Sequence, residues 1–169
     1  MKKEIGGYLE LEESTGQEYY PELCGVNLGR TALLWLMEAR KLQKKIYLPT
    51  YLCDSVTGAC EETKVEIEFY HMDEKLCPLL PEKKLPDGEY LYLVNYYGQL
   101  TDDRIRQYRE IYGNIIVDHT HAFFQKPLPG VDYFVLLPEI PGGQRRGISV
   151  NGCESASGKE TAGSFHGKT

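Results

Sequence analysis

Three residues with titratable side chains follow directly on a short apolar segment in the second half of the chain. Asp118, His119 and His121 come after residues 115–117, which are Ile-Ile-Val. Ligands of open α/β sheets bind at the carboxyl ends of strands, so this position is a candidate site. One chemistry open to these side chains is metal binding, with the distant His71 as a further nitrogen ligand, although successive residues after a strand need not converge. Structural roles are also open, because Asp118 could cap the next helix and His121 could be a satisfied interior histidine.

A second candidate lies where residues 27–33, Asn-Leu-Gly-Arg-Thr-Ala-Leu, enter a predicted helix. A helix N-terminus presents free N–H groups and the positive end of its dipole to an anion. Gly29 and Arg30 therefore mark a possible phosphate site, although a glycine also commonly precedes an ordinary core helix.

The elements that must position these residues alternate between helix and strand. Good helix formers with helical spacing predict a helix over residues 31–43, and helix caps or breakers predict two more, over 54–63 and 101–112. Apolar or alternating segments predict strands over residues 46–48, 65–70, 90–95, 114–118 and 133–137, while the proline-rich residues 77–88 form a loop. This order is typical of a three-layer α/β/α sandwich with a mostly parallel sheet.

Composition excludes several classes of protein. The 169 residues carry a net charge of −6 with mixed signs, which argues against a nucleic-acid partner, and no apolar run is long enough for a membrane span. The five cysteines include no CxxC pair, which favours reduced thiols in a cytoplasmic protein. Residues 138–169 are rich in Gly, Ser, Arg and Lys without hydrophobic periodicity, so we expect residues 1–137 to form the folded part and 138–169 to be largely disordered.

Four short segments, in order, resemble motifs of the DegT/StrS-type sugar aminotransferases, a branch of the fold-type-I pyridoxal-phosphate-dependent transferases. Residues 27–33 resemble the family's Ser-Gly-Thr-Ala-Ala-Leu. Residues 48–52, Leu-Pro-Thr-Tyr-Leu, resemble its strand-Pro-Ser segment. Residues 94–99, Val-Asn-Tyr-Tyr-Gly-Gln, are similar to its Val-His-Leu-Tyr-Gly-Gln. Residues 115–122 resemble its Ile-Glu-Asp-Ala-Ala-His/Gln-Ala.

The resemblance covers about residues 20–135 and implies the N-terminal part of that family's large domain, with pyridoxal 5'-phosphate as cofactor. It implies that Asp118 pairs with the pyridine nitrogen, that His121 contacts the ring oxygen and that Gly29 helps to hold the phosphate. Arg30 replaces the usual threonine there, and its guanidinium could substitute for the lost hydroxyl. The ring-stacking aromatic position falls near Cys53, so Tyr51 is the candidate for stacking. For the intact family it implies transamination between an amino donor and a sugar or related keto substrate, in a homodimer.

The lysine that holds the cofactor as a Schiff base is missing. In the family it follows one strand after the aspartate, but residues 136–144 contain no lysine, and Lys126, Lys159 and Lys168 are poorly placed. The chain therefore resembles a truncated or frameshifted, catalytically incomplete member. Our hypothesis is that residues 138–169 are translated out of frame. The alternatives are a non-catalytic remnant that binds a cofactor or partner, and a metal-binding protein using Asp118, His119 and His121.

Overall fold

The computed structural model describes residues 19–20, 23–26, 28–135 and 146–149. Its strands form one seven-stranded sheet in the order β1-β7-β6-β5-β4-β2-β3. The strands are β1 (Cys24–Val26), β2 (Lys45–Pro49), β3 (Glu66–Tyr70), β4 (Glu89–Val94), β5 (Ile115–Asp118), β6 (Asp132–Val135) and β7 (Arg146–Ser149). The five strands from β3 to β6 in this order are parallel, and β7 runs antiparallel to its neighbours β6 and β1.

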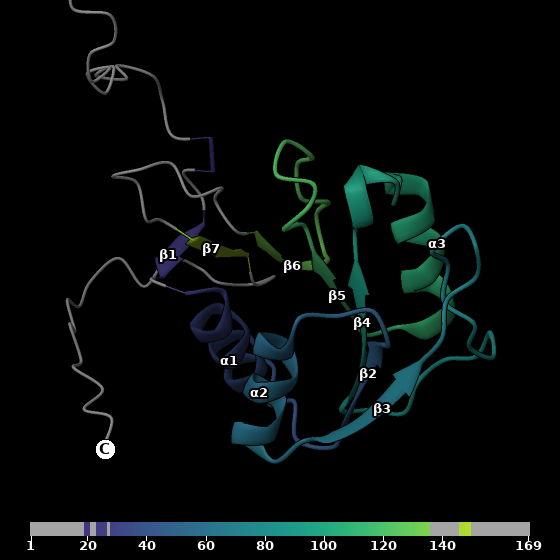
Figure 1. The fold of residues 1–169 in the computed structure, drawn as a ribbon, viewed down its shortest axis with the longest axis horizontal. Coiled ribbons are helices and arrows are strands. Elements are labelled where there is room, and N and C mark those ends of the chain that lie inside the picture. The colour runs from purple at the N-terminus through teal and green to yellow at the C-terminus, as the bar shows by residue number, and fades with distance from the viewer. Residues whose placement is uncertain (1–18, 21–22, 27, 136–145, 150–169) are drawn as a thin grey trace, which may run out of the picture.

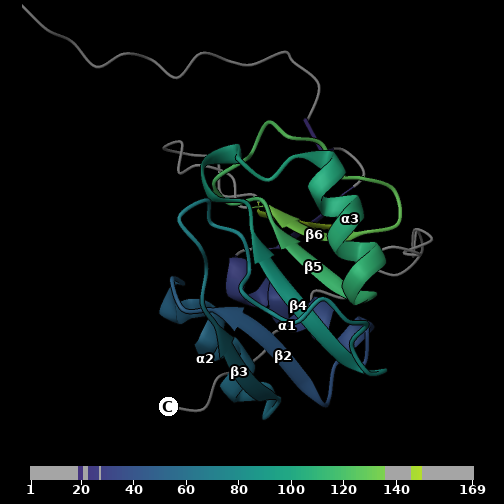
Figure 2. The same cartoon turned by 90° about the vertical axis from the view of Figure 1, so that its right-hand side faces the viewer.

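Helices cover both faces of the sheet, which confirms the predicted α/β/α sandwich. Helices α1 (Gly29–Ala39) and α2 (Asp54–Thr63) lie together on one face, and α3 (Asp102–Tyr112) lies on the other (Figures 1 and 2). Two separate apolar clusters fill the spaces between the layers. Tyr92 of β4 belongs to the cluster under α1 and α2, whereas its neighbours Leu91 and Leu93 belong to the cluster under α3. This alternation places β4 between two cores, as its near-continuous apolar run predicts.

Local sequence explains the helix ends. Thr101 caps α3 by accepting a hydrogen bond from the Arg104 backbone N–H at 3.4 Å, and Gly113, with φ of 85°, ends the helix as predicted. Helix α1 differs from its prediction, because it ends at Ala39 rather than at residue 43. Lys41 adopts a left-handed φ of 51°, and the chain turns there to enter β2. A run of helix-forming residues does not by itself show where the turn falls.

Two strands were absent from the predicted set. β1 has only three residues, too few for a periodic pattern. β7 (Arg146–Ser149) lies within the segment 138–169, which the sequence predicts to be largely disordered, and that prediction for the segment as a whole stays a prediction. The backbone groups of β7 pair with β1 and β6 on both sides, and this pairing needs no hydrophobic periodicity. The rest of that segment lies outside the described residues. No helix in the described ranges is long and apolar enough to cross a lipid bilayer.

Candidate cofactor site

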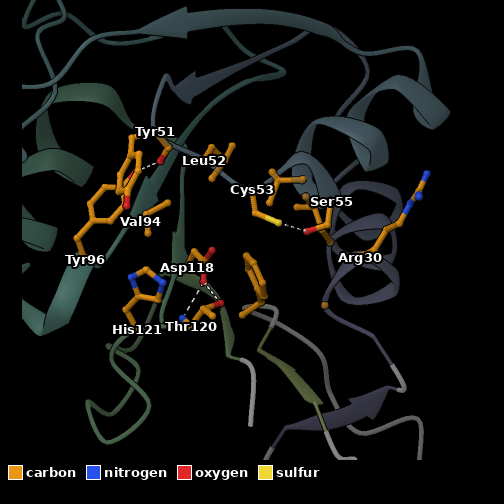
Figure 3. A pocket seen from close by; sticks show the side chains of 14 residues that line it. Arg30, Tyr51, Leu52, Cys53, Ser55, Val94, Tyr96, Asp118, Thr120 and His121 are labelled. Carbon is orange, nitrogen blue, oxygen red and sulfur yellow. Dashed lines mark hydrogen bonds between the residues drawn. The ribbon is translucent and has the colours of Figure 1, made fainter. Parts of the chain in front are cut away.

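A cavity of about 460 Å³ lies at the carboxyl edge of the parallel strands, beside the N-termini of α1 and α2 (Figure 3). Cavities of this size are typical of small-molecule sites. All five residues that the sequence marks as cofactor-binding line it: Gly29, Arg30, Tyr51, Asp118 and His121. The other lining residues are Leu33, Leu52, Cys53, Ser55, Val56, Val94, Tyr96, Thr120 and Phe134. Segments separated by more than one hundred positions in the chain, from Gly29 to Phe134, therefore meet at one place.

The floor of the cavity is a row of three side chains from adjacent strands. Val94 of β4 pairs with Asp118 of β5, and Asp118 pairs with Phe134 of β6. All three line the cavity on the face that α1 and α2 cover. Asp118 is thus a carboxylate set between apolar neighbours, and only 6% of it is exposed.

Three hydrogen bonds hold the Asp118 carboxylate. Tyr92 Oη donates to Oδ2 at 2.8 Å, and the Thr120 backbone N–H donates to Oδ1 at 2.7 Å. The Thr120 hydroxyl also donates to Oδ1. Burial nevertheless raises the pKa of Asp118, because the charged form loses more solvation than these donors restore. A bound cation beside the carboxylate would supply the missing stabilisation.

Tyr92 is a reliable donor to this carboxylate. It is fully buried in β4, and burial, together with the charge of Asp118, raises its pKa well above the ordinary value. The phenol therefore stays protonated at neutral pH and keeps its hydrogen for Oδ2. Sequence reasoning missed Tyr92 and Thr120. For Tyr92 the reason is that the register between β4 and β5, which brings it to Asp118, cannot be read from the amino-acid sequence.

The N-terminus of α1 forms the opposite side of the cavity. Gly29 is buried, and the first intrahelical hydrogen bond runs from Ala32 N to Leu28 O at 3.0 Å. The backbone N–H groups of Gly29 and Arg30 lie ahead of that bond. Leu28 provides no side-chain cap, and the first turn has no acidic residue. This helix end is suited to an anion because nothing in its own first turn neutralises the dipole.

The Arg30 side chain does not take the place suggested for it by the sequence. Its Nη2 donates to Gly58 O at 3.1 Å and lies 3.2 Å from Glu62 Oε2, so the guanidinium binds α2. Figure 3 shows it directed away from Asp118. The expectation that the guanidinium replaces a threonine hydroxyl in the cavity is therefore not met in this arrangement.

Aromatic rings stand at the rim near Asp118. The Tyr51 and Tyr96 rings stack with centroids 5.6 Å apart, and the Tyr96 hydroxyl donates to the Tyr51 carbonyl. The His121 ring stacks on Tyr97 at 5.5 Å and lies 6.1 Å from Tyr96. Tyr51 is 60% exposed, so it lies at the entrance and does not fill the core. Sequence reasoning matched residues 94–99 to a family motif but did not single out Tyr96.

Sulfur and hydroxyl groups line the side formed by α2. The Ser55 hydroxyl lies 3.1 Å from Cys53 Sγ at the start of that helix (Figure 3). Cys53 is exposed and stands at the position where the resemblance expects an aromatic residue. A planar ring bound against Asp118 would therefore meet a thiol on this side.

The metal-binding alternative finds no support in the geometry. His119 points to the opposite face of the sheet, where its ring meets Tyr133 edge-to-face at 4.6 Å, because successive strand residues alternate between faces. Burial lowers the pKa of His119 to about 4, so it is neutral at physiological pH. Within the described ranges no group of three or more His, Cys, Asp or Glu side chains could hold a metal ion.

None of the described residues that line the cavity is a lysine. The ammonium of Lys126 lies over the rings of Tyr19 and Tyr20, 3.5 and 4.5 Å from their centroids, and donates to the Tyr19 carbonyl. Lys126 therefore has other partners at the edge of the loop that follows β5. Residues 136–145, where the resemblance would place a lysine, lie outside the described residues and contain none in the sequence.

No protein-family model matches the sequence, and no curated protein matches it. Solved structures match its fold. BacF from Bacillus subtilis in a substrate-bound form has a TM-score of 0.58 at 12% identity, over 79% of this chain and 44% of that chain. A proposed histidinol-phosphate aminotransferase from Erwinia carotovora atroseptica has a TM-score of 0.56 at 12% identity, over 78% and 46%. A proposed sugar aminotransferase from Streptococcus pneumoniae in its PLP form has a TM-score of 0.53 at 12% identity, over 69% and 38%.

The chain spans less than half the length of each of these three structures. At such low identity the likeness concerns the fold alone, and it does not distinguish the DegT/StrS branch from others. The five parallel strands with their flanking helices match part of the large domain of pyridoxal-phosphate-dependent transferases. In fold, this chain resembles part of the fold-type-I aminotransferases.

Proposed function

We propose that the cavity binds pyridoxal 5'-phosphate without a covalent link, and that this chain is a catalytically incomplete aminotransferase-type domain. The observation that carries the proposal is the Asp118 carboxylate, buried at the floor of the cavity and oriented by Tyr92 and Thr120. A pyridinium nitrogen is the cationic partner that such a carboxylate lacks. The N-terminus of α1, which begins at Gly29, lines the same cavity and offers backbone N–H groups for the phosphate.

Each part of the site has a separate role in this proposal. When bound, the cofactor would supply a protonated ring that stabilises negative charge at a substrate carbon. Asp118 holds the proton at the ring nitrogen, while Tyr92 and Thr120 fix the carboxylate's direction. Tyr51 and Tyr96 close the rim on one side of the ring plane, and His121 stands beside them to contact the ring oxygen.

The missing lysine limits what the chain can do. No described lining residue carries an amine that could bind the aldehyde or move a proton at the substrate carbon. We therefore propose cofactor binding but no transamination by this chain as it stands. For an intact relative, the resemblance supports transfer of an amino group from a donor to a sugar or related keto substrate in a homodimer. Translation of residues 138–169 out of frame stays a prediction that sequencing the gene decides.

A titration with 4'-deoxypyridoxine 5'-phosphate tests the proposal. This probe has the ring nitrogen and the phosphate but no aldehyde, so it cannot form adducts with surface lysines. Isothermal titration of the full chain should show one site, with weaker binding of pyridoxine, which lacks the phosphate. Inorganic phosphate that binds as tightly as the probe would contradict a ring site. If a folded chain binds no probe at millimolar concentration, the proposal of cofactor binding is wrong, and only a non-catalytic remnant without a cofactor remains.

Covalent attachment needs its own measurement. The chain is incubated with pyridoxal 5'-phosphate, reduced with borohydride, digested and mapped by mass spectrometry. We expect scattered substoichiometric labelling of surface lysines. Stoichiometric labelling of a single lysine would show that the chain attaches the cofactor, and the catalytically incomplete assignment would then be wrong.

A further inference from the structure

A second cavity lies under α3, on the face of the sheet opposite to α1 and α2. Its volume is about 300 Å³, and its walls combine apolar and aromatic side chains with two basic ones. The lining residues are Tyr70, Met72, Lys75, Leu76, Cys77, Pro78, Leu93, Val94, Tyr96, Gln99, Leu100, Arg104 and Tyr108. Only Val94 and Tyr96 also line the cofactor cavity, so these two residues separate the two spaces.

Arg104 is held at the wall of this second cavity by neutral partners. Its Nη2 donates to Tyr108 Oη at 2.9 Å and to Cys77 Sγ at 2.7 Å. Its guanidinium carbon also lies 5.4 Å from the centre of the Tyr108 ring. The side chain is therefore fixed against the helix by two uncharged groups, and the nearest carboxylate, that of Asp73, acts on its charge without forming an ion pair with it. The other N–H groups of Arg104 remain for a planar anion, because a guanidinium has five N–H donors in a rigid fork.

No carboxylate of the described chain forms an ion pair with Arg104 or Lys75. Asp73 is the acidic residue nearby, but its Oδ1 accepts the backbone N–H groups of Lys75 and Cys77 at 2.9 and 2.8 Å. These bonds lower the pKa of Asp73 and fix it within the loop. Two cations thus border the cavity, and the Asp73 carboxylate interacts electrostatically with both but forms an ion pair with neither.

We propose that this second cavity binds a small organic anion with one carboxylate and an apolar body. The carboxylate would lie on Arg104, and the apolar body would lie between Leu93, Leu100 and Tyr96. Two cationic side chains beside apolar ones are the usual arrangement of a site that selects amphipathic anions. The proposal does not rest on the proposed function, since the cofactor cavity is a separate space.

Phenylacetate is a suitable probe, and phenylacetamide is its neutral match in shape. Binding is followed by chemical-shift changes of the methyl groups of Met72, Leu93 and Leu100 in the full chain. A ligand of this size should bind with a dissociation constant of about a millimolar. Phenylacetamide should bind at least about tenfold more weakly, because it cannot form charge-assisted hydrogen bonds with the guanidinium.

Two variants on the same helix separate charge from fold. Arg104→Gln should weaken phenylacetate binding about tenfold or more and leave phenylacetamide unchanged. Arg106→Gln is the control, because Arg106 pairs with the exposed Asp103 and does not line the cavity. Arg104→Lys should lie between wild type and Arg104→Gln, since it keeps the charge but loses the fork. Circular dichroism and melting curves establish that each variant folds.

The outcomes decide between the sites as well. Phenylacetate that binds with the same affinity in the presence and absence of 4'-deoxypyridoxine 5'-phosphate, together with a loss in Arg104→Gln, supports a separate anion cavity, whether or not that probe itself binds. Equal binding of acid and amide would overturn the anion proposal, as would equal losses in Arg104→Gln and Arg106→Gln. The proposal would also be overturned by chemical-shift changes confined to residues of the cofactor cavity. The same holds if no shift changes at a phenylacetate concentration about tenfold above the expected dissociation constant of about a millimolar.

Discussion

Replacing Asp118 by asparagine should weaken probe binding while leaving the fold intact. The carboxylate is only 6% exposed, so its bond to a pyridinium is shielded from water. A hydrogen bond to a charged group contributes about 1.5–3 kcal/mol. Since about 1.4 kcal/mol is tenfold in affinity, Asp118→Asn should bind 4'-deoxypyridoxine 5'-phosphate roughly 10- to 100-fold more weakly. Isothermal titration at fixed pH and salt measures the change.

The same substitution should not reduce the stability of the free chain at neutral pH. Burial raises the pKa of Asp118 above its unfolded value, so the folded state binds the proton more tightly. Stability is then greatest below the unfolded pKa and falls as pH rises through the folded pKa. The neutral asparagine lacks that loss, so its free energy of unfolding at pH 7 should equal or exceed that of wild type. A function that costs stability is common at binding sites.

The control for this pair of measurements is Asp103→Asn, an exposed carboxylate at the start of α3. It should leave probe affinity unchanged. Probe binding to Asp118→Asn within twofold of wild type would refute the pairing of Asp118 with the ring nitrogen. A large loss of stability in the free variant would refute the claim that the empty site disfavours the charged carboxylate.

Three further results are expected. Tyr92→Phe removes a buried donor to Asp118, so pH titration by NMR should give a still higher pKa for Asp118, and an unchanged pKa would contradict the 2.8 Å bond. His119 has its pKa lowered to about 4 by burial, so stability should fall as pH decreases from about 6.5 to 4, by up to about 3 kcal/mol. Urea unfolding of His119→Phe should show a flatter pH profile there, and an equal slope would count against the assignment. Arg40→Met removes the bonds of 2.8 and 2.7 Å to the buried Asp132 and should cost about 3 kcal/mol in urea unfolding, where a loss below about 0.5 kcal/mol would contradict a structural role.

Much of the fold could be predicted because its signals are local. Apolar residues predicted the strand over 90–95, which is β4, and helix caps or breakers predicted the helix over 101–112, which is α3. β7 could not be predicted, because it is defined by backbone pairing with β1 and β6, and β1 lies more than one hundred positions away in the chain. The early end of α1 at Ala39 depends on how the chain turns into β2, which propensity does not encode.

The candidate site divides in the same way. That Gly29, Tyr51, Asp118 and His121 line one cavity could be predicted, because each follows a strand or starts a helix, and parallel strands bring such positions to one edge. Their roles toward a cofactor stay predictions. The partners of Asp118 could not be predicted. Tyr92 reaches it through the register between β4 and β5, which is a tertiary property.

Arg30 differs from the other four residues. Its residue type suggested an anion contact, but its guanidinium donates to Gly58 O and lies 3.2 Å from Glu62 Oε2 of α2. Only the packing of α1 against α2 reveals that a nearby carboxylate competes for the same side chain.

The protonation state of a bound pyridine ring tests the central claim most directly. The chain is saturated with 4'-deoxypyridoxine 5'-phosphate labelled with ¹⁵N in the ring, and the nitrogen chemical shift is followed as pH rises. We predict a pyridinium shift that persists to a higher pH than in the free probe, and that reverts toward the free value in Asp118→Asn. A bound ring that loses its proton at the same pH as the free probe, in wild type and variant alike, would contradict the account.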